Sequence, residues 1–559
     1  MKSKNLIYVL YFVLTIGVAK AQSPFEEEIT LPTYDESNSE MMIIDEMSDW
    51  SHINDADKKY FFVKPGDYSG GKWPVYLRKS GTADSKRYIV LYNGNNTHPG
   101  KLDRSELAKV DFIFDNTDYW VVDRMAYWDE PDAYNPIQIK NSDNNIINRY
   151  YMHDVGNGIY MFPGSDNNTV QNCRIERDDI SVYHDRAAIG LNNNRENNIA
   201  IKNTKILNNE IYNFVDGIQT IRVNEYVAHN NNYEGTIIDY NHIYIDSTIY
   251  TDGKGNHNPN GNYAYAENAL DLKVGSDNPD NPIIITNNIM WGFRESDRTN
   301  SDLGDAGAVM PVHYDANNII VENNISFDAT VGFSIADPKV SYSMANSRIS
   351  NNIFYDIKKH VIFLADASNI IFEKNLYKKV GGNYGSYWLE CHNNKGIEFS
   401  DNITVDGNNS KVRFNNSNFT STNNEYFQAK PGDIADDSDV IHTSDPTANY
   451  EDFVFTTDRY TNSPREITIP KIKPVSTGLI FIEDGNEINI YPNPTAGKIS
   501  VEGENLEEIE FIDISGKYYS SNRLGNKNRY DLSGFPKGLY FAKITTKTGA
   551  FITKKIILQ

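Results

Sequence analysis

The run Asn324-Ile-Ser-Phe327, with Asn352-Ile-Phe-Tyr355 and Asn375-Leu-Tyr377, decides the fold class of this chain. Each is a short β-rich run that opens with asparagine, and such runs recur from about residue 140 to about residue 405. The shortest interval between their first asparagines is 23 residues, and other intervals are longer by insertions. The other runs begin at Asn148, Asn172, Asn203, Asn241, Asn288 and Asn402. Repetition of this kind predicts a solenoid in which each unit forms one coil.

Two further strands accompany most of these runs. An alternating segment such as Pro282-Ile-Ile-Ile-Thr286 precedes the run, and another such as Gly332-Phe-Ser-Ile-Ala336 follows it, with polar corners between them. Asparagine tolerates the left-handed backbone that tight corners require, and no segment has a helical period. We therefore expect an all-β chain folded as a right-handed parallel β-helix. A β-propeller is the weaker alternative, because its blades need about 40–50 residues.

Composition and charge narrow the classes of partner. The chain has 559 residues, of which 39% are hydrophobic and 23% charged, a globular balance that excludes a disordered protein. Its formal net charge of −23 gives no broad attraction to phosphate backbones or anionic lipid. We expect no nucleic-acid partner. Cys173 and Cys391 are the two cysteines, so no disulfide framework is expected.

The N-terminus has the pattern of an export signal. Lys2 and Lys4 precede an apolar run at residues 6–18, and Ala19-Lys-Ala21 follows it as a small-residue cleavage site. The apolar run is shorter than the roughly 20 residues of a membrane-spanning helix, so we expect no membrane span. Residues 1–21 are predicted to be a signal peptide, 22–54 an N-terminal leader and cap, and 55–465 the β-helix. The mature protein is expected to be secreted or attached to the cell surface, and to be a monomer.

A second module follows a proline-bearing linker predicted at residues 466–487. Its sequence contains Asn489-Ile-Tyr-Pro-Asn-Pro494, then Gly538-Leu-Tyr540, and ends on Lys554-Lys-Ile556 and three further residues. In this order the motifs closely resemble the C-terminal sorting domain of the type IX secretion system of Bacteroidetes. The resemblance implies that residues 488–559 form a small β-sandwich that is recognised by the secretion machinery. A generic β-sandwich binding module is the alternative.

The third strands of successive coils predict the position of a site. Side chains alternate along a strand and stack at about 4.8 Å between coils, so a site is a column of polar residues on one outer face. If Leu270 and Leu272 point inward, Ala269, Asp271 and Lys273 point outward. With a one-residue bulge, Lys273 becomes the neighbour of a basic residue on each adjacent coil. The expected strip of positive charge consists of Arg222, Lys273 and His313, flanked by Asn192 and Asp337.

A basic strip on an acidic protein suits a uronate-containing polysaccharide. Elimination across its glycosidic bond begins with removal of the proton beside the carboxylate, so charge neutralisation and a base are required. Lys273 is the predicted base, with a pKa lowered by like-charge repulsion from Arg222 and His313. The nearby carboxylates are suitable Ca²⁺ ligands. The expected calcium ligands are Glu267, Asp271 and Asp315.

The segment Glu267-Asn-Ala-Leu-Asp271-Leu-Lys273, followed by Val312-His313-Tyr-Asp315, resembles β-helix polysaccharide lyases of the chondroitinase B and alginate lyase type. The resemblance implies a calcium ligand at Glu267, the base at Lys273 and a catalytic histidine at His313. The family's arginine position falls on Val312, so Arg294 or Arg222 has to replace it. The expected substrate-binding residues are Gln219, Asn192, Tyr265 and Trp291, the last two as aromatic surface for sugar rings.

Three alternatives stay open at this stage. Lys273 and Glu267 could form an ordinary surface ion pair. A glycoside hydrolase acting on a plant or algal polysaccharide needs two carboxyl groups about 5–9.5 Å apart. Asp178, Asp179 and Asp185 are candidates for that pair, because adjacent acids resemble the β-helix polygalacturonases. A glycan-binding surface protein without catalysis would use the same repeat and export signals.

Overall fold

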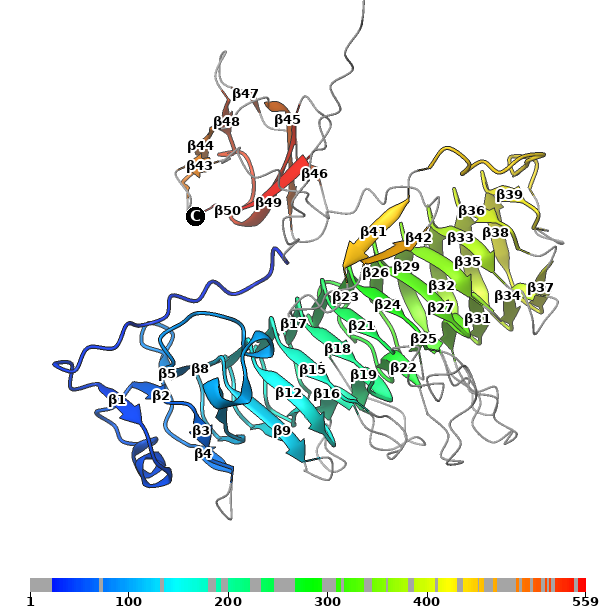
Figure 1. The fold of residues 1–559 in the computed structure, drawn as a ribbon. Coiled ribbons are helices and arrows are strands. Elements are labelled where there is room, and N and C mark those ends of the chain that lie inside the picture. The colour runs from blue at the N-terminus through cyan, green and yellow to red at the C-terminus, as the bar shows by residue number, and fades with distance from the viewer. Residues whose placement is uncertain are drawn as a thin grey trace, which may run out of the picture. The chain divides into compact units, whose positions relative to one another are not determined.

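A computed structural model gives the fold of the chain (Figure 1). The residues that it describes are 23–69, 74–130, 135–178, 187–192, 200–221, 233–245, 267–293, 308–312, 316–335, 344–357, 360–380, 387–407, 411–429, 436–450, 452–456, 466–469, 489–491, 495–502, 506–513, 518–519, 522–523, 528–546 and 551–558.

Three long parallel sheets wind around one axis and confirm the right-handed parallel β-helix (Figure 1). Sheet A contains β1 (Met41–Ile44), β2 (Tyr60–Val63), β5 (Arg87–Leu91), β8 (Trp120–Asp123), β11 (Ile146–Asn148), β14 (Thr169–Gln171), β17 (Lys205–Leu207), β20 (Ile237–Asp239), β23 (Ile283–Thr286), β26 (Ile319–Glu322), β29 (Ala345–Ser350), β32 (Ser368–Glu373), β35 (Lys395–Ser400) and β38 (Phe419–Thr422). Sheet B contains β3 (Gly66–Asp67), β6 (Ala108–Lys109), β9 (Ala126–Glu130), β12 (Tyr151–Val155), β15 (Arg174–Glu176), β18 (Glu210–Tyr212), β21 (His242–Tyr244), β24 (Ile289–Trp291), β27 (Ile325–Ala329), β30 (Ile353–Ile357), β33 (Leu376–Val380), β36 (Ile403–Val405), β39 (Glu425–Phe427) and β40 (Val440–Ile441). Sheet C contains β4 (Val75–Leu77), β7 (Phe112–Asp115), β10 (Ile137–Lys140), β13 (Ile159–Met161), β16 (Ala187–Asn192), β19 (Asp216–Ile221), β22 (Asn268–Leu272), β25 (Ala308–Val312), β28 (Val331–Ile335), β31 (Ile362–Ala365), β34 (Tyr387–His392) and β37 (Lys411–Asn415). Three short 3-10 helices lie near the N-terminal end, η1 (Met47–His52), η2 (Pro99–Lys101) and η3 (Arg104–Glu106).

The interior of the β-helix is a continuous apolar core. Ile218 and Leu270 occupy equivalent positions on β19 and β22 and are fully buried in this core. Gln219 and Asp271, the next residues along, pair with each other on the outer face. The start of β22 departs from strict alternation, because Ala269 joins the core instead of pointing outward as expected.

Asparagines line the corner between sheets A and B as a buried ladder. The backbone N–H of Asn209 donates to Oδ1 of Asn241 at 3.0 Å, and the side-chain Nδ2 donates to the same oxygen at 2.9 Å. The same pair of bonds links each later member to the next. The members are Asn209, Asn241, Asn288, Asn324, Asn352, Asn375, Asn402 and Asn424. Asp439 ends the ladder by accepting from Asn424 N at 2.8 Å and Nδ2 at 3.1 Å.

The corners themselves use the left-handed backbone that the sequence predicts. Asn323 and Asn351, each directly before a ladder asparagine, have φ of 58° and 55°. Asparagine adopts this conformation at low cost because its short polar side chain can bond locally. The repeated asparagine pairs therefore serve two purposes, a bend and a buried hydrogen bond.

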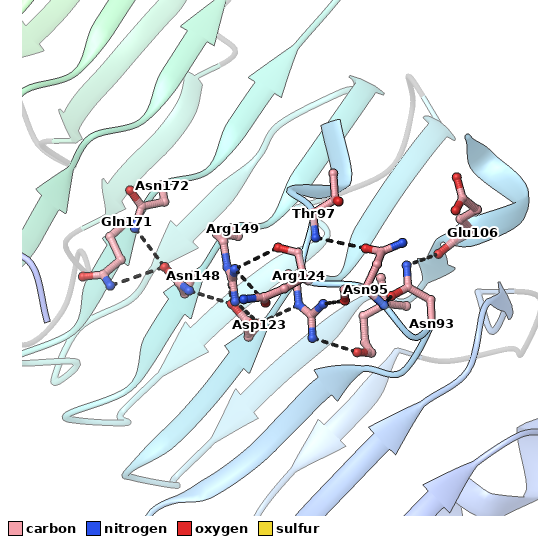
Figure 2. A network of polar contacts seen from close by, with 12 residues as sticks. Asn93, Asn95, Thr97, Glu106, Asp123, Arg124, Asn148, Arg149, Gln171 and Asn172 are labelled. Carbon is pink, nitrogen blue, oxygen red and sulfur yellow. Dashed lines mark hydrogen bonds and ion pairs between the residues drawn. The ribbon is translucent and has the colours of Figure 1, made fainter. Parts of the chain in front are cut away.

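Polar contacts on sheet A tie down the N-terminal segments (Figure 2). Asp123 is fully buried, and its carboxylate accepts from Arg124 Nε at 3.0 Å, Arg149 Nη2 at 2.6 Å and Asn148 Nδ2 at 2.6 Å. Arg124 also donates to the carbonyl of Asn95, so the charged group holds the loop that carries η2 and η3. This part of sheet A is occupied by structural contacts.

A two-stranded hairpin covers part of sheet B. It is formed by β41 (Phe453–Thr456) and β42 (Glu466–Ile469), which pair antiparallel. Beneath it, Tyr244, Trp291 and Phe327 stack on adjacent strands with ring centroids 4.8 and 5.5 Å apart. Phe455 of the hairpin packs against Phe327 at 5.7 Å. The hairpin and the stacked rings form a second apolar cluster outside the main core.

The chain divides into two compact units, residues 25–476 and a unit containing residues 477–559. The first strand, β1, lies inside the expected leader, and β42 lies inside the expected linker. The C-terminal module has two four-stranded antiparallel sheets, which confirm a small β-sandwich. One sheet contains β43 (Asn489–Tyr491), β44 (Lys498–Glu502), β48 (Arg529–Asp531) and β47 (Asn522–Arg523), and the other β46 (Tyr518–Tyr519), β45 (Leu506–Asp513), β49 (Gly538–Thr546) and β50 (Phe551–Leu558). The predicted signal peptide, 1–21, lies outside the described residues.

Candidate functional site

A polar cluster on the outer face of sheet C contains the residues around Lys273. Gln219 donates through Nε2 to Asp216 Oδ2 at 3.1 Å and to Asp271 Oδ2 at 2.7 Å. Asn268 donates to Asp216 Oδ1 at 3.0 Å. Parallel pairing of β19 with β22 places these groups together, because it aligns Asp216 with Asn268 and Gln219 with Asp271. One amide therefore links two carboxyl groups from adjacent coils.

Lys273 follows β22 directly and is held against this cluster. Its Nζ lies 2.8 Å from Asp271 Oδ2; the lysine side chain is 25% exposed and the aspartate 1%. Its backbone N–H donates to the hydroxyl of Thr220 at 2.9 Å, which fixes the strand end. Because the carboxylate is buried, this ion pair differs from an ordinary pair between two solvated surface side chains.

The expected pKa of Lys273 is wrong in direction. Burial alone lowers the pKa of this amine, but the carboxylates of Asp271, Asp216 and Glu267 outweigh it and raise the pKa above the ordinary value of a lysine. The charges that raise its pKa are acidic. Arg222 and His313, the other members of the predicted strip of positive charge, lie outside the described residues, so the strip stays a prediction. In the substrate-free site Lys273 is an ammonium ion.

The pKa of Asp216 is also raised, which for a carboxyl group favours the neutral form. Burial raises its pKa well above the ordinary value, and the negative charges of Glu267 and Asp271 raise it further, while Lys273 opposes them. Its side chain is almost fully buried. A buried carboxyl group with a raised pKa beside a second carboxyl group is an arrangement common in acid–base sites.

The structure places the other expected residues as follows. Asn192 is half-buried at the end of β16 on the same sheet, where it pairs with Ile221. Gln219 is at the centre of the cluster, and Glu267 directly precedes β22, where its backbone N–H donates to Val215 O at 2.8 Å. The residues that lie outside the described part of the chain are Arg222, Tyr265, Arg294, His313, Asp315 and Asp337, together with Asp179 and Asp185 of the hydrolase alternative.

Trp291 does not belong to this site, so its expected role in substrate binding is wrong. It lies on β24 in sheet B, is 6% exposed, and stacks between Tyr244 and Phe327 under the hairpin. Its Nε1 donates to His242 Nε2 at 2.9 Å. Trp291 is a packing residue because Tyr244 and Phe327 stack on its ring and the hairpin residues belong to the same apolar cluster.

Asp216 and Asn268 are functional candidates that the sequence reasoning missed. Asp216 is the first residue of β19 and Asn268 the first residue of β22, and neither belongs to the predicted column of outward residues. The signal that could have found them is the equal spacing of Asp216 to Gln219 and Asn268 to Asp271, three residues in each strand. Asp178, by contrast, lies at a corner after β15 in sheet B, 3.7 Å from His153, and not on sheet C.

Two groups of residues merit consideration for a metal ion. Asp216, Glu267 and Asp271 offer oxygen ligands alone, the type that a hard cation such as Ca²⁺ prefers, and all three act electrostatically on Lys273. Within the described ranges, the group whose ligand atoms lie within 4.8 Å of one another is Asp129, His153 and Asp154. In that second group both carboxylate oxygens of Asp129 are bound by Arg104, which already neutralises them.

A comparison with protein families identifies the C-terminal part of the chain. Residues 489–559 match the family described as the secretion system C-terminal sorting domain, so the chain is a parallel β-helix protein that carries such a domain. No curated protein matches it in sequence. No helix in the described part of the chain has the length and hydropathy that crossing a membrane requires.

Several solved structures are similar in chain path. An alginate lyase from Paenibacillus sp. strain FPU-7 is 14% identical, with 61% of this chain and 96% of that chain covered and a TM-score of 0.38. A mannuronic acid-specific polysaccharide family 6 lyase from human gut microbiota is 10% identical, with 72% and 90% covered and a TM-score of 0.41. An exopolygalacturonase from Thermotoga maritima is 9% identical, with 74% and 86% covered and a TM-score of 0.33.

Proposed function

We propose that this protein is an exported enzyme that cleaves a uronate-containing polysaccharide by β-elimination, with Lys273 as the group that removes the proton. The observation that supports this most is the position of Lys273, paired with Asp271 at 2.8 Å on the outer face of sheet C among polar residues from two coils. The C-terminal sorting domain supports export through the type IX machinery to the surface or the medium.

The elimination requires three events at one sugar. The C–H bond beside the carboxylate breaks and its proton passes to the amine of Lys273. The electron pair left behind forms a C=C bond as the glycosidic C–O bond at the next carbon breaks, and the leaving oxygen takes up a proton. Gln219 and Asn192 lie on the same sheet and would bind sugar hydroxyls. Arg222 or Arg294, with His313, are proposed to neutralise the substrate carboxylate and serve the leaving group.

Lys273 has to lose its proton before it can act as a base. Asp271 and the acidic groups beside it favour the ammonium form, so any cation that neutralises them favours the neutral amine. Asp216, Glu267 and Asp271, with Asp315, are the residues that would hold Ca²⁺, and the ion would supply this neutralisation. Removal of calcium by a chelator is therefore expected to reduce activity.

The test is direct. Wild type should release unsaturated sugars, detected by their ultraviolet absorbance, from a uronate polymer, and Lys273→Ala should lower that rate by about a thousandfold or more. Lys374→Ala, which removes an exposed lysine at a corner next to sheet A, is the matched control. Full activity of Lys273→Ala would overturn the assignment.

A second candidate function, glycoside hydrolysis, is supported by one specific observation. Asp216 Oδ2 and Asp271 Oδ2 bond the same nitrogen of Gln219 at 3.1 and 2.7 Å, so they lie no further apart than 5.8 Å, the sum of these distances. Retaining hydrolases hold their carboxyl groups about 5–5.5 Å apart, one protonated and one ionised. This reaction would release reducing ends without ultraviolet absorbance, and Asp216→Asn would abolish it. A glycan-binding protein would release neither product.

A further inference from the structure

The outer face of sheet C carries a second polar and aromatic cluster beyond Asp271. Phe363 lies on β31, three strands along the sheet from β22, and Glu390 and Arg413 follow it on the next two strands. At about 4.8 Å per strand, Phe363 lies about 14 Å from the position of Asp271. His360 and His392 complete this distal cluster, which occupies the same face as the proposed catalytic residues.

Phe363 forms the centre of this distal cluster. Its ring is half-buried on an outward position and contacts two imidazoles, with centroids 5.5 Å away for His360 and 5.7 Å for His392 and interplanar angles of 50° and 49°. The face of Phe363, with these tilted imidazoles at its edge, makes a small apolar platform with a polar rim. Such a platform suits a sugar, whose ring has an apolar face and hydroxyls around its rim.

Hydrogen bonds hold the polar groups around the ring in fixed positions. Glu390 Oε1 accepts from His392 Nε2 at 2.9 Å and from Arg413 Nη1 at 3.1 Å. Asn415 donates through Nδ2 to His392 Nδ1 at 3.0 Å. Arg413 offsets the charge of Glu390, so the cluster has little net charge although the chain is strongly acidic.

A polar hollow adjoins the cluster at the corner after β31, β34 and β37. Its volume is about 810 Å³, and its lining includes Asp366, Asn393, Lys395, Asn416 and Asn418. Amide, carboxylate and ammonium groups of this kind bond sugar hydroxyls and carboxylates. Asn393, which lines the hollow, directly follows His392 of the platform in the sequence.

A buried hydroxyl lies between the distal cluster and the catalytic position. Ser334 pairs with Phe363 on the neighbouring strand and, since Phe333 is in the core, points outward. Its side chain is fully buried, and Oγ has no hydrogen-bond partner in the described part of the chain. A buried hydroxyl without a partner costs free energy, which a ligand atom would recover.

We propose that Phe363, His360, His392 and Arg413 form a distal subsite that binds a sugar of the same polysaccharide chain, several residues from the bond that is cleaved. The assignment rests on the proposed function for the identity of the polymer. The substrate lies along sheet C across the coils, and the protein acts on chains long enough to span about 14 Å rather than on disaccharides.

The experiment measures binding and kinetics with saturated uronate oligosaccharides of about two and about eight sugars, chosen to fall short of this span or exceed it. Phe363→Ala should weaken binding of the longer oligosaccharide about tenfold by calorimetry and raise its KM with kcat unchanged. Binding of the shorter one should not change. Tyr92→Ala, which removes a partly exposed aromatic ring from the opposite part of the coil, is the control and should have no effect.

The outcomes separate the two proposals. If Phe363→Ala weakens binding of the longer oligosaccharide but wild type forms no unsaturated product, the subsite stands and β-elimination does not. If wild type forms the product and Phe363→Ala leaves KM for the longer substrate unchanged, β-elimination stands and the subsite is wrong. Far-ultraviolet circular dichroism of each variant shows whether the fold is retained, and Phe363→Tyr, which keeps the ring, should restore binding.

Discussion

Asp216 and Asp271 accept hydrogen bonds from the same amide nitrogen of Gln219, at 3.1 and 2.7 Å, although 55 positions separate them in the sequence. The shared donor brings two carboxyl groups and the ammonium of Lys273 into one small buried volume. Such a volume cannot hold every group in its ordinary charge state, because burial and like-charge repulsion both oppose ionisation. The protonation of this cluster therefore has measurable consequences.

The first concerns stability and pH. The pKa of Asp216 is raised in the folded chain, mainly by burial, so the folded state keeps a proton that the unfolded state loses above the ordinary value of 3.8. Asp216 thus contributes stability that is fully present below that value and is lost as the pH rises toward the folded pKa. Asp216→Asn cannot ionise and should remove this loss.

Denaturant unfolding at about pH 5 and about pH 8 tests this expectation. The difference in free energy of unfolding between the two should shrink by at least about 1 kcal/mol in the variant, the value of a one-unit pKa shift. Asp437→Asn, at an exposed turn, is the control and should keep the wild-type difference. An unchanged difference in Asp216→Asn would show that Asp216 titrates normally.

A second prediction concerns the carboxylate that pairs with Lys273. Burial lowers the pKa of this lysine and Asp271 is the largest influence that raises it, so Asp271→Asn should lower the pKa. If Lys273 is the base, kcat/KM rises with pH as the ammonium loses its proton. That rise should move to lower pH in the variant, by about one unit or more.

The measurement is the pH profile of kcat/KM, which reports the free enzyme described here. Glu398→Gln, at an exposed position on β35 of sheet A, should leave the profile where it is. A rise that stays at the wild-type pH, or moves upward, would assign the titration to another group.

The repeat and the site differ in how far the sequence could predict them. Asn324, Asn352 and Asn375 predicted the coils correctly because each makes the same ladder bond directly after a left-handed corner residue. The environment of Lys273 depends instead on the register between β19 and β22. A long insertion separates these two strands, so Asp216 could not be aligned with Asn268 by counting. The pKa of Lys273 is raised mainly by Asp271, two positions earlier in the sequence, and Asp216 on the adjacent coil adds to this effect.

Trp291 shows a second limit. An outward aromatic residue on a β-strand has the same local sequence whether it faces solvent or lies under another segment. Its cover, the hairpin β41–β42, comes more than a hundred residues later and has no feature that identifies its docking position. Burial of an outward residue is set by such distant contacts, which neither alternation nor composition encodes.

A third prediction tests the hairpin. Phe455→Ala should open the cover over the stacked rings, lower the free energy of unfolding by about 2 kcal/mol, and shift tryptophan emission to longer wavelength as Trp291 gains water. Val454→Ala, on the same strand with a side chain that is 46% exposed, is the matched control. Equal effects of the two substitutions would mean that the hairpin does not rest on the ring stack.

The last prediction concerns the end of the asparagine ladder. Each member accepts two N–H groups from the preceding coil through its Oδ1 and donates its own backbone and side-chain N–H groups to the next member. The last asparagine, Asn424, therefore needs an acceptor that does not have to donate to a further coil. The carboxylate of Asp439 supplies it, with Oδ1 bound to Asn424 N and Nδ2 and Oδ2 accepting from Ser421 Oγ at 2.9 Å. Asp439→Ala removes the acceptor of the buried backbone N–H of Asn424, whereas the side-chain amide keeps its bonds to Phe399 O and Ser421 Oγ, both at 2.9 Å. The loss should lower the free energy of unfolding by about 1–3 kcal/mol. Hydrogen exchange should speed up first at Asn424 and Asn402, where the ladder loses its end, while Asp437→Ala changes neither quantity. Exchange that accelerates equally along the whole ladder would contradict an end-capping role, because it would mean that the coils open together rather than from this end.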